Sequence, residues 1–377
     1  MNSRRWICHP YIRHYNKFSK LISLAYKTYY TRCVRMENPF SLTFGQKPME
    51  MISRKNQLRQ ITDTFEMDRP TNHVFMIAGV RGAGKTVSLS EISEHFNTKD
   101  DWIVINLNPD SDMMTDSISE INRMSSSKKL DISANINIPV AGSVTIKNAE
   151  KDLNDTSRMK ILLDEIDKRG KRVLFVIDEI VSNEYIRVFA GQFQIWLREE
   201  RPVYLLMAGL YENISNIQNE KTLTFLYRAT KIVLKPLSVP AISARYQEIF
   251  EIDAMEAAEM AKATKGYSFA FQILGYLRWE KRQPLKKLIP DYDADLAEYA
   301  YDKIWAELSP NDKKVAQIIA SGKTKVGEIR NELGVTSQYM NIYRRRLIAS
   351  GIVSGDTRGI LTFTLPRFEV YISLYCE

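Results

Sequence analysis

Apolar runs and helical repeats alternate along residues 73–237. The apolar runs are short and continuous, as expected of strands that are buried on both faces. They span residues 73–78, 101–107, 172–180, 201–210 and 229–237. Between them apolar residues recur at helical spacing, for example at Leu89, Ile92 and Phe96. Strands that alternate with helices predict an α/β fold, with a parallel sheet covered by helices on both faces.

One stretch departs from this alternation. Residues 130–147 (LDISANINIPVAGSVTIK) place apolar side chains at every second position. This period is typical of a strand with one buried face. We expect an inserted β-hairpin or a mobile excursion here.

The first apolar run leads into the glycine-rich stretch GVRGAGKT (79–86), which matches the phosphate-binding pattern G-x-x-x-x-G-K-[ST]. Glycines let the backbone curl so that its N–H groups point at phosphate oxygens, and the following helix adds its positive N-terminal end. Lys85 would reach the β- and γ-phosphates, and the Thr86 hydroxyl would be a ligand of Mg²⁺. The predicted ATP-binding residues are Gly79, Val80, Arg81, Gly82, Ala83, Gly84, Lys85, Thr86 and Val87.

A carboxylate pair follows the third apolar run, in RVLFVIDEI (172–180). Asp178 at the end of a strand would hold Mg²⁺, and Glu179 would act as the general base toward an attacking water. An acidic pair that simply closes a buried strand is the alternative. The glycine-rich loop roughly 90 residues upstream makes the combination specific. Two adjacent carboxylates favour ATP hydrolysis over simple kinase chemistry.

The last 70 residues predict a separate module with helices, a turn, a further helix and a β-wing. Met340, Tyr343 and Leu347 recur at helical spacing and predict the buried face of the last of these helices. The opposite face carries side chains that can contact base edges and phosphates in a major groove. The candidate DNA-binding residues are Gln338, Asn341, Arg344 and Arg345, with Arg358 at the tip of the wing.

Net charge supports DNA binding only weakly. Residues 1–35 carry eight Lys and Arg and no Asp or Glu, whereas the rest of the chain holds 45 basic and 45 acidic side chains. This basic tail could be a transit peptide or membrane-surface helix, a basic arm for nucleic acid, or an extension upstream of a domain that starts at Met36. Residues 309–377 hold ten basic and six acidic side chains, a modest surplus for a DNA-binding domain.

Cysteine usage and hydropathy bear on location. The three cysteines lack metal-like or disulfide-like spacing, which favours a reducing interior. No apolar run approaches the roughly 18 residues of a membrane span. We therefore expect a cytoplasmic protein without a membrane partner.

Several segments in order carry a resemblance to known ATPases: NPFSLTFGQKP (38–48), GVRGAGKT, VLFVIDEI (173–180), KPLS (235–238) and KGYSFAFQILGY (265–276). Over residues 36–375 the chain resembles prokaryotic AAA-type ATP-binding proteins related to archaeal origin-recognition ATPases, and it is also similar to STAND ATPases. The resemblance implies an ATPase domain at 36–237, a helical lid at 238–307 and a winged helix at 308–377. It also implies that Arg228 reaches ATP, either its own or a neighbour's, where it could stabilise transition-state charge. Arg228 could equally be a plain surface residue.

The chain departs from these relatives at two places. Many AAA ATPases end the strand at 201–210 with a polar residue that contacts the γ-phosphate, but this chain has MAG (207–209). Phe269 occupies the place of the lid arginine of origin-recognition relatives. STAND proteins have Gly-x-Pro-x-Ala in the lid, and this chain keeps Gly266 and Ala270 but has Ser268 in place of the proline. We therefore expect slow hydrolysis.

These observations predict an ATP-binding molecular switch, with ATP or ADP and Mg²⁺ as ligands, that couples its nucleotide state to double-stranded DNA through the winged helix. The alternative is a STAND-like signalling or defence ATPase. Its winged helix would latch against the nucleotide domain or contact protein partners, including other copies of the chain, instead of DNA. A metabolic kinase is disfavoured because no separate substrate domain is apparent.

Overall fold

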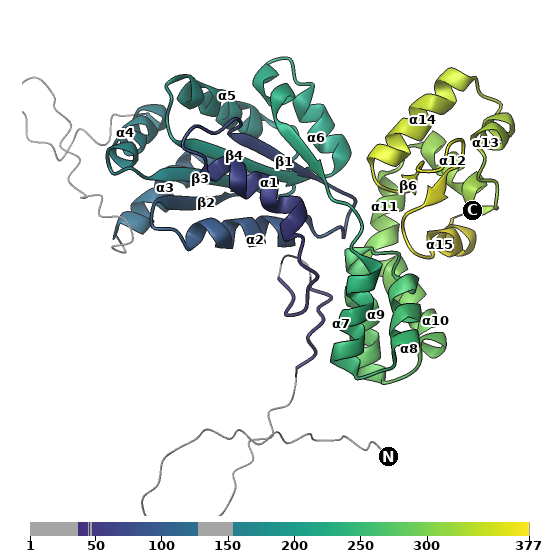
Figure 1. The fold of residues 1–377 in the computed structure, drawn as a ribbon. Coiled ribbons are helices and arrows are strands. Elements are labelled where there is room, and N and C mark those ends of the chain that lie inside the picture. The colour runs from purple at the N-terminus through teal and green to yellow at the C-terminus, as the bar shows by residue number, and fades with distance from the viewer. Residues whose placement is uncertain (1–36, 44, 46, 127–153, 377) are drawn as a thin grey trace, which may run out of the picture.

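The computed structural model describes residues 37–43, 45, 47–126 and 154–376 (Figure 1). The basic tail at 1–35 and the predicted insertion at 130–147 lie outside these residues.

A five-stranded parallel sheet forms the centre of the first half of the chain. Its strands are β1 (Val74–Ala78), β2 (Trp102–Leu107), β3 (Arg172–Ile177), β4 (Val203–Gly209) and β5 (Thr230–Val233). They are ordered β2-β3-β4-β1-β5, and every neighbouring pair is parallel. Since parallel strands end at the same edge, the residues that follow β1, β3 and β4 meet there. The predicted parallel sheet is confirmed.

Helices cover both faces of this sheet (Figure 1). Helices α1 (Lys55–Glu66) and α2 (Lys85–Asn97) pack on one face with Phe75 and Ile77 of β1. Val74 and Met76 point to the other face. The helices on that face are α3 (Met113–Ser126), α4 (Asp155–Lys168), α5 (Glu184–Arg198) and α6 (Tyr211–Gln218). Burial on both faces explains why the strands are continuous apolar runs.

The sheet is followed by a helical region at the place of the predicted lid, and we call these residues, 238–307, the lid. It consists of α7 (Val239–Phe250), α8 (Ala254–Ala263), α9 (Ser268–Lys281), α10 (Leu285–Leu296), the π-helix η3 (Ala297–Tyr301) and α11 (Asp302–Glu307). Ser238 caps the start of α7 by accepting a hydrogen bond from the Ala241 N–H, and Asp253 caps α8 in the same way.

A C-terminal module (residues 308–376) follows α11. Helices α12 (Pro310–Ala320), α13 (Val326–Leu333) and α14 (Ser337–Ala349) precede the strands β6 (Val353–Ser354) and β7 (Thr362–Phe363). The two strands pair antiparallel. A last helix, α15 (Phe368–Tyr375), lies in the stretch where the sequence predicted only the β-wing.

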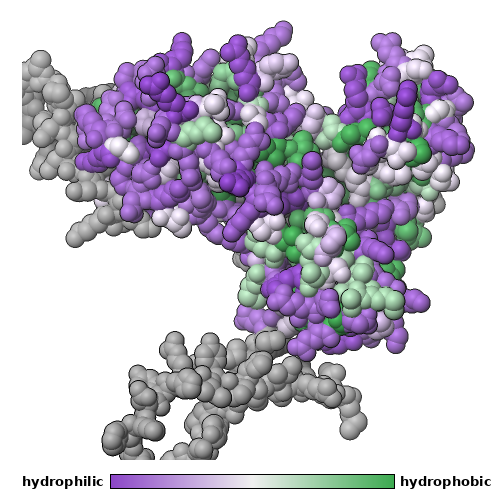
Figure 2. All heavy atoms as spheres, in the orientation of Figure 1, coloured by the Kyte–Doolittle hydropathy of each residue, from purple (hydrophilic) through white to green (hydrophobic). Residues whose placement is uncertain are grey.

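Lid and C-terminal module share one hydrophobic core. The rings of Tyr301 and Phe368 meet edge to face, with centroids 4.9 Å apart. The Tyr371 hydroxyl donates to Asp302 Oδ1 at 2.8 Å. The visible surface is largely hydrophilic, and hydrophobic residues gather where the sheet domain, lid and module meet (Figure 2). None of the helices in the described part of the chain has the length and apolar character that a membrane span requires.

Candidate nucleotide site

The glycine-rich loop connects β1 to α2 at the carboxyl edge of the sheet. Gly82 and Gly84 have φ values of 74° and 92°, a left-handed conformation that residues other than glycine rarely adopt. Lys85 opens α2, whose N-terminal N–H groups point toward the loop. Sequence and backbone thus form an anion-binding cradle at a helix N-terminus.

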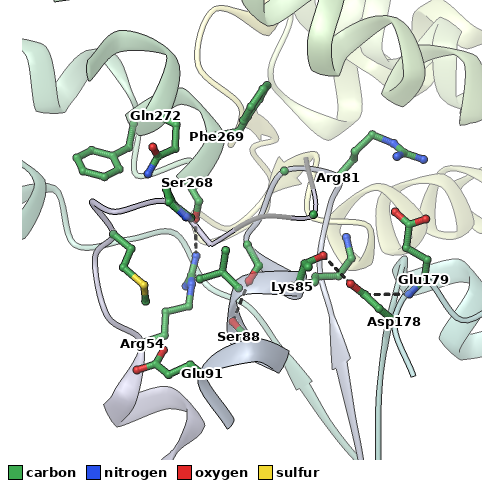
Figure 3. A pocket seen from close by; sticks show the side chains of 18 of the residues that line it. Arg54, Arg81, Lys85, Ser88, Glu91, Asp178, Glu179, Ser268, Phe269 and Gln272 are labelled. Carbon is green, nitrogen blue, oxygen red and sulfur yellow. Dashed lines mark hydrogen bonds between the residues drawn. The ribbon is translucent and has the colours of Figure 1, made fainter. Parts of the chain in front are cut away.

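The predicted phosphate and metal residues lie together (Figure 3). The Thr86 hydroxyl donates to Asp178 Oδ2 at 2.6 Å, although β4 separates the strands that lead to these residues. The Lys85 ammonium donates to the carbonyls of Gly79 (3.0 Å) and Val80 (3.1 Å). Asp178 Oδ1 accepts a hydrogen bond from the Glu179 N–H at 2.8 Å.

Burial lowers the pKa of Lys85 to about 8, and the charge of Asp178 offsets part of this effect. Glu179 has a φ of 51°, which is uncommon for a residue with a side chain. Strained backbone of this kind concentrates at functional sites, because surrounding structure must hold it in place.

The end of β4 explains why no polar side chain stands there. A Cβ atom at Gly209 would lie 2.8 Å from Cγ2 of Ile180, whose N–H donates to the Ala208 carbonyl at 2.8 Å. The turn after β3 thus occupies the space of a strand-end side chain. Asn213 in the first turn of α6 lines the same cavity and supplies a polar amide that sequence reasoning did not single out.

The site opens into a cavity of about 380 Å³, within the usual range for ligand sites. Its other walls come from the segment before α1 and from α9. Gln272 of α9 holds that segment, because its amide accepts from the Ser41 N–H (3.0 Å) and donates to the Glu50 carbonyl (2.7 Å). The N-terminal segment, known from the sequence only as a family resemblance, is therefore part of the site.

Arg54 joins the loop to the lid. Its guanidinium donates to the Ala83 carbonyl at 3.0 Å and to the Ser268 hydroxyl at 2.9 Å, and it also donates to the Lys235 carbonyl. Burial lowers the pKa of Arg54 to about 10, which the charge of Glu91 partly offsets. Sequence reasoning missed Arg54, because its partners lie far along the chain.

The start of α9 also rests directly on the glycine-rich loop. The Tyr267 hydroxyl donates to the Arg81 carbonyl at 2.6 Å, and the Phe269 N–H donates to the Gly82 carbonyl at 3.1 Å. A Cβ atom at Gly82 would lie only 2.2 Å from the Tyr267 hydroxyl oxygen. Gly82 is therefore required both by its backbone angle and by the approach of the lid.

The other side of the loop faces α11 and the C-terminal module. The Arg81 guanidinium donates to Glu307 Oε1 at 2.9 Å, and Glu307 lines the cavity. A Cβ atom at Gly351, which follows α14, would lie 3.9 Å from Val80 Cβ. The module thus comes close to the nucleotide cradle, and Val80 packs against the core that lid and module share.

Arg346 of α14 is close enough to the sheet domain to interact with its charges. Arg346 pairs with the buried Asp312 at 2.6 Å, which raises the pKa of Arg346, and Glu212 of α6 adds to the effect through its charge. Figure 1 shows α6 and α14 facing each other.

The structure does not bring Arg228 to the cavity. Arg228 ends the short helix η2 (Thr224–Arg228), is exposed, and precedes β5, whose opposite end leads to the cavity. Its use at this chain's own nucleotide is not supported by this arrangement. A role toward a neighbouring molecule stays a prediction.

The predicted DNA-binding residues differ in exposure. Gln338, Asn341 and Arg345 are exposed on α14, and Arg358 is exposed between β6 and β7. Arg344 is half-buried instead, and its Nε is buried without a hydrogen-bond partner among the described residues. The exposed face is therefore narrower than the sequence suggested.

The residues at the carboxyl edge fit a nucleotide with Mg²⁺. The loop offers N–H donors and the Lys85 ammonium to phosphates. The Thr86 hydroxyl and the Asp178 carboxylate are adjacent and present two oxygen ligands to one metal ion. Mg²⁺ in such sites takes one or two carboxylates and completes its shell with phosphate and water. The donor set therefore suits a nucleotide-bound Mg²⁺.

Comparison with known proteins gives a match of one segment to a family model and a similar fold. Residues 298–372, from the π-helix into α15, match the family model described as Domain of unknown function (DUF8462). A search among curated proteins finds no match to the chain.

Among solved structures, the chain is similar to the Walker-type ATPase PABY2304 of Pyrococcus abyssi, with 15% identity and a TM-score of 0.60 over 86% of this chain and 96% of that one. It is less similar to the ORC2 protein of Aeropyrum pernix (14% identity, TM-score 0.49, 85% and 90% covered) and to Cdc6p of Pyrobaculum aerophilum (15%, 0.43, 89% and 96%). The likeness to the Pyrococcus abyssi protein shows that this chain has a P-loop ATPase fold, with a parallel sheet followed by a helical C-terminal region.

Proposed function

We propose that this protein is an ATP-binding molecular switch with slow ATPase activity. The observation that carries the proposal is the assembly of Lys85, Thr86, Asp178 and Glu179 at one end of a ligand-sized cavity. These residues come from two strand ends that only the parallel sheet brings together.

Each residue has a defined role in this proposal. Lys85 and the loop N–H groups bind the phosphates, while Thr86 and Asp178 hold Mg²⁺, which supplies charge neutralisation when bound. Glu179 accepts a proton from the attacking water. Turnover is slow because β4 ends in glycine and Phe269 replaces a lid cation.

We further propose that the nucleotide state controls a winged helix formed by the C-terminal module, which binds double-stranded DNA through α14. Gln338, Asn341 and Arg345 support this proposal, because they are exposed and of the types that contact bases and phosphates. The lid lies between cradle and module. Nucleotide can therefore shift the module only if its affinity differs between two positions of the lid.

A second function is favoured by the contact between module and cradle. Gly351 of the module lies close to Val80, and Glu307 at the end of α11, directly before the module, pairs with Arg81, so the module is placed to latch the nucleotide domain. In that case nucleotide exchange would release protein contacts, including contacts between copies of the chain, and DNA would play no part.

DNA binding measured against salt concentration, with ATP, ADP or no nucleotide, separates the two. A DNA switch should show affinity that falls steeply with salt and differs between ATP and ADP by about fivefold or more. Lys85→Ala should abolish the nucleotide effect, whereas Lys168→Ala, which removes an exposed lysine of α4, should not. Absence of DNA binding at low salt in every state would leave the latch as the function.

A further inference from the structure

An acidic side chain stands at the phosphate end of the cavity without a role in binding phosphate. Asp178 and Glu179 have roles there, but Glu307 comes from the last turn of α11 and lines the same cavity. In Figure 3, Arg81 lies on the side of Glu179, whereas Arg54, Ser268 and Gln272 lie toward the opposite end. Arg81, the ion-pair partner of Glu307, therefore lies at the end of the cavity where a third phosphate would be placed.

Arg81 is incompletely satisfied by this pairing. Its NH2 group donates to Glu307, and its side chain is about one third exposed. Its Nε is buried and has no hydrogen-bond partner among the described residues. Buried donors normally have partners, so a guanidinium that turned away from Glu307 toward the phosphates would give this Nε the acceptor that it lacks.

Charge makes the two partners respond oppositely to a triphosphate. Additional phosphate charge attracts the Arg81 guanidinium and repels the Glu307 carboxylate. The pair is partly exposed, with 33% and 40% of its side-chain surface accessible, so it is weak enough to exchange. A diphosphate ends one phosphate short and leaves the pair in place.

We propose that Glu307 determines the discrimination between nucleoside di- and triphosphate, and that a triphosphate takes Arg81 from Glu307 and so releases the C-terminal module from the cradle. This inference rests on the proposed nucleotide binding. Loss of the pair frees α11 from the loop. Because α11 and the module share one core, the module then moves with α11, and Gly351 moves away from Val80.

The experiment compares affinities for ADP and for a non-hydrolysable ATP analogue, both with Mg²⁺, by calorimetry on the full chain. Glu307→Gln should bind the triphosphate about three- to tenfold more tightly and change ADP affinity less than about twofold. Glu307→Asp keeps the charge and should stay closer to wild type. Glu120→Gln, which breaks an exposed ion pair with Arg123 on α3, is the matched control and should change neither affinity.

Small-angle scattering supplies a second readout. Wild type should expand with the triphosphate analogue and not with ADP, and Glu307→Gln should expand at a lower analogue concentration. Equal shifts for both nucleotides, or wild-type behaviour of Glu307→Gln, would overturn this inference and leave the nucleotide site intact. Failure of wild type to bind either nucleotide would overturn the proposed function as well.

Discussion

Raising the pH from 7 to 9.5 should weaken ATP binding through Lys85. Burial lowers the pKa of this ammonium to about 8 in the free protein. Bound phosphates favour the charged form and raise the pKa again. Above pH 8, binding must therefore be accompanied by proton uptake, and the free energy of that uptake reduces the affinity.

The size of the effect follows from the pKa. If only the charged form binds, the apparent dissociation constant rises about twofold at pH 8, about tenfold at pH 9 and about 30-fold at pH 9.5. The terminal phosphate has a pKa near 6 and stays ionised throughout this range. Folding stability of the free protein should move the other way. Between pH 8 and 10.5 the unfolded chain binds more protons at Lys85, so the cost of burying its charge is relieved as the pH rises.

Calorimetry at pH 7, 8, 9 and 9.5, in pairs of buffers with different ionisation enthalpies, measures both affinity and proton uptake. Lys85→Arg is the control, because a guanidinium stays charged over the whole range. This variant should bind more weakly at pH 7 but with a flat pH profile. Wild-type affinity that stays constant to pH 9.5, or binding without proton uptake, would refute the reasoning.

Four further outcomes test the site and the module. Glu179→Gln should keep ATP affinity and lower turnover at least tenfold in a phosphate-release assay, whereas unchanged turnover would place the base elsewhere. Asn213→Ala should lower turnover with little change in affinity, and an equal loss of both would show that it only shapes the cavity. Gly82→Ala should cost about 1–3 kcal/mol of unfolding free energy and weaken ATP binding, because its Cβ meets Tyr267, and a wild-type melting curve would argue against the lid contact. Arg345→Ala should leave ATP affinity unchanged and weaken DNA binding. The salt slope should fall by about one if Arg345 contacts a phosphate, whereas the binding free energy should fall by ~1–3 kcal/mol if it contacts a base. DNA binding equal to that of wild type would exclude Arg345 from the interface.

The sheet and the loop were accessible from sequence because their signals are local. Continuous apolar runs report burial on both faces, and the spacing of Gly84, Lys85 and Thr86 reports a backbone shape. The pairing of Thr86 with Asp178 could be inferred because parallel strands end at one edge. These parts of the site needed no knowledge of packing between distant segments.

The remaining walls of the cavity depend on tertiary packing. Arg54 precedes an ordinary amphipathic helix, and its role appears only when the loop and α9 approach it. Glu307 ends a short helix, and nothing in its neighbourhood along the chain indicates Arg81, which lies 226 residues away. Helix α15 was missed because FEVYISLY follows a predicted strand and contains aromatic and β-branched residues that favour strands.

Because lid and C-terminal module share one core, residues 238–376 would move as a single rigid arm in the proposed switch. Its fulcrum lies where Gly266 packs so closely on the linker after β5 that an added Cβ atom would come within 2.4 Å of the Leu237 carbonyl oxygen. In the proposed switch, a small rotation at this point would move the distal tip of the arm much further than the cradle itself. Stiffness then matters as much as ligand contact. Loosening the ring packing between Tyr301 and Phe368 would let the arm bend there, so the rotation would not reach α14. Disabling substitutions are therefore expected midway along the arm, in residues that touch neither the nucleotide nor the surface that it controls.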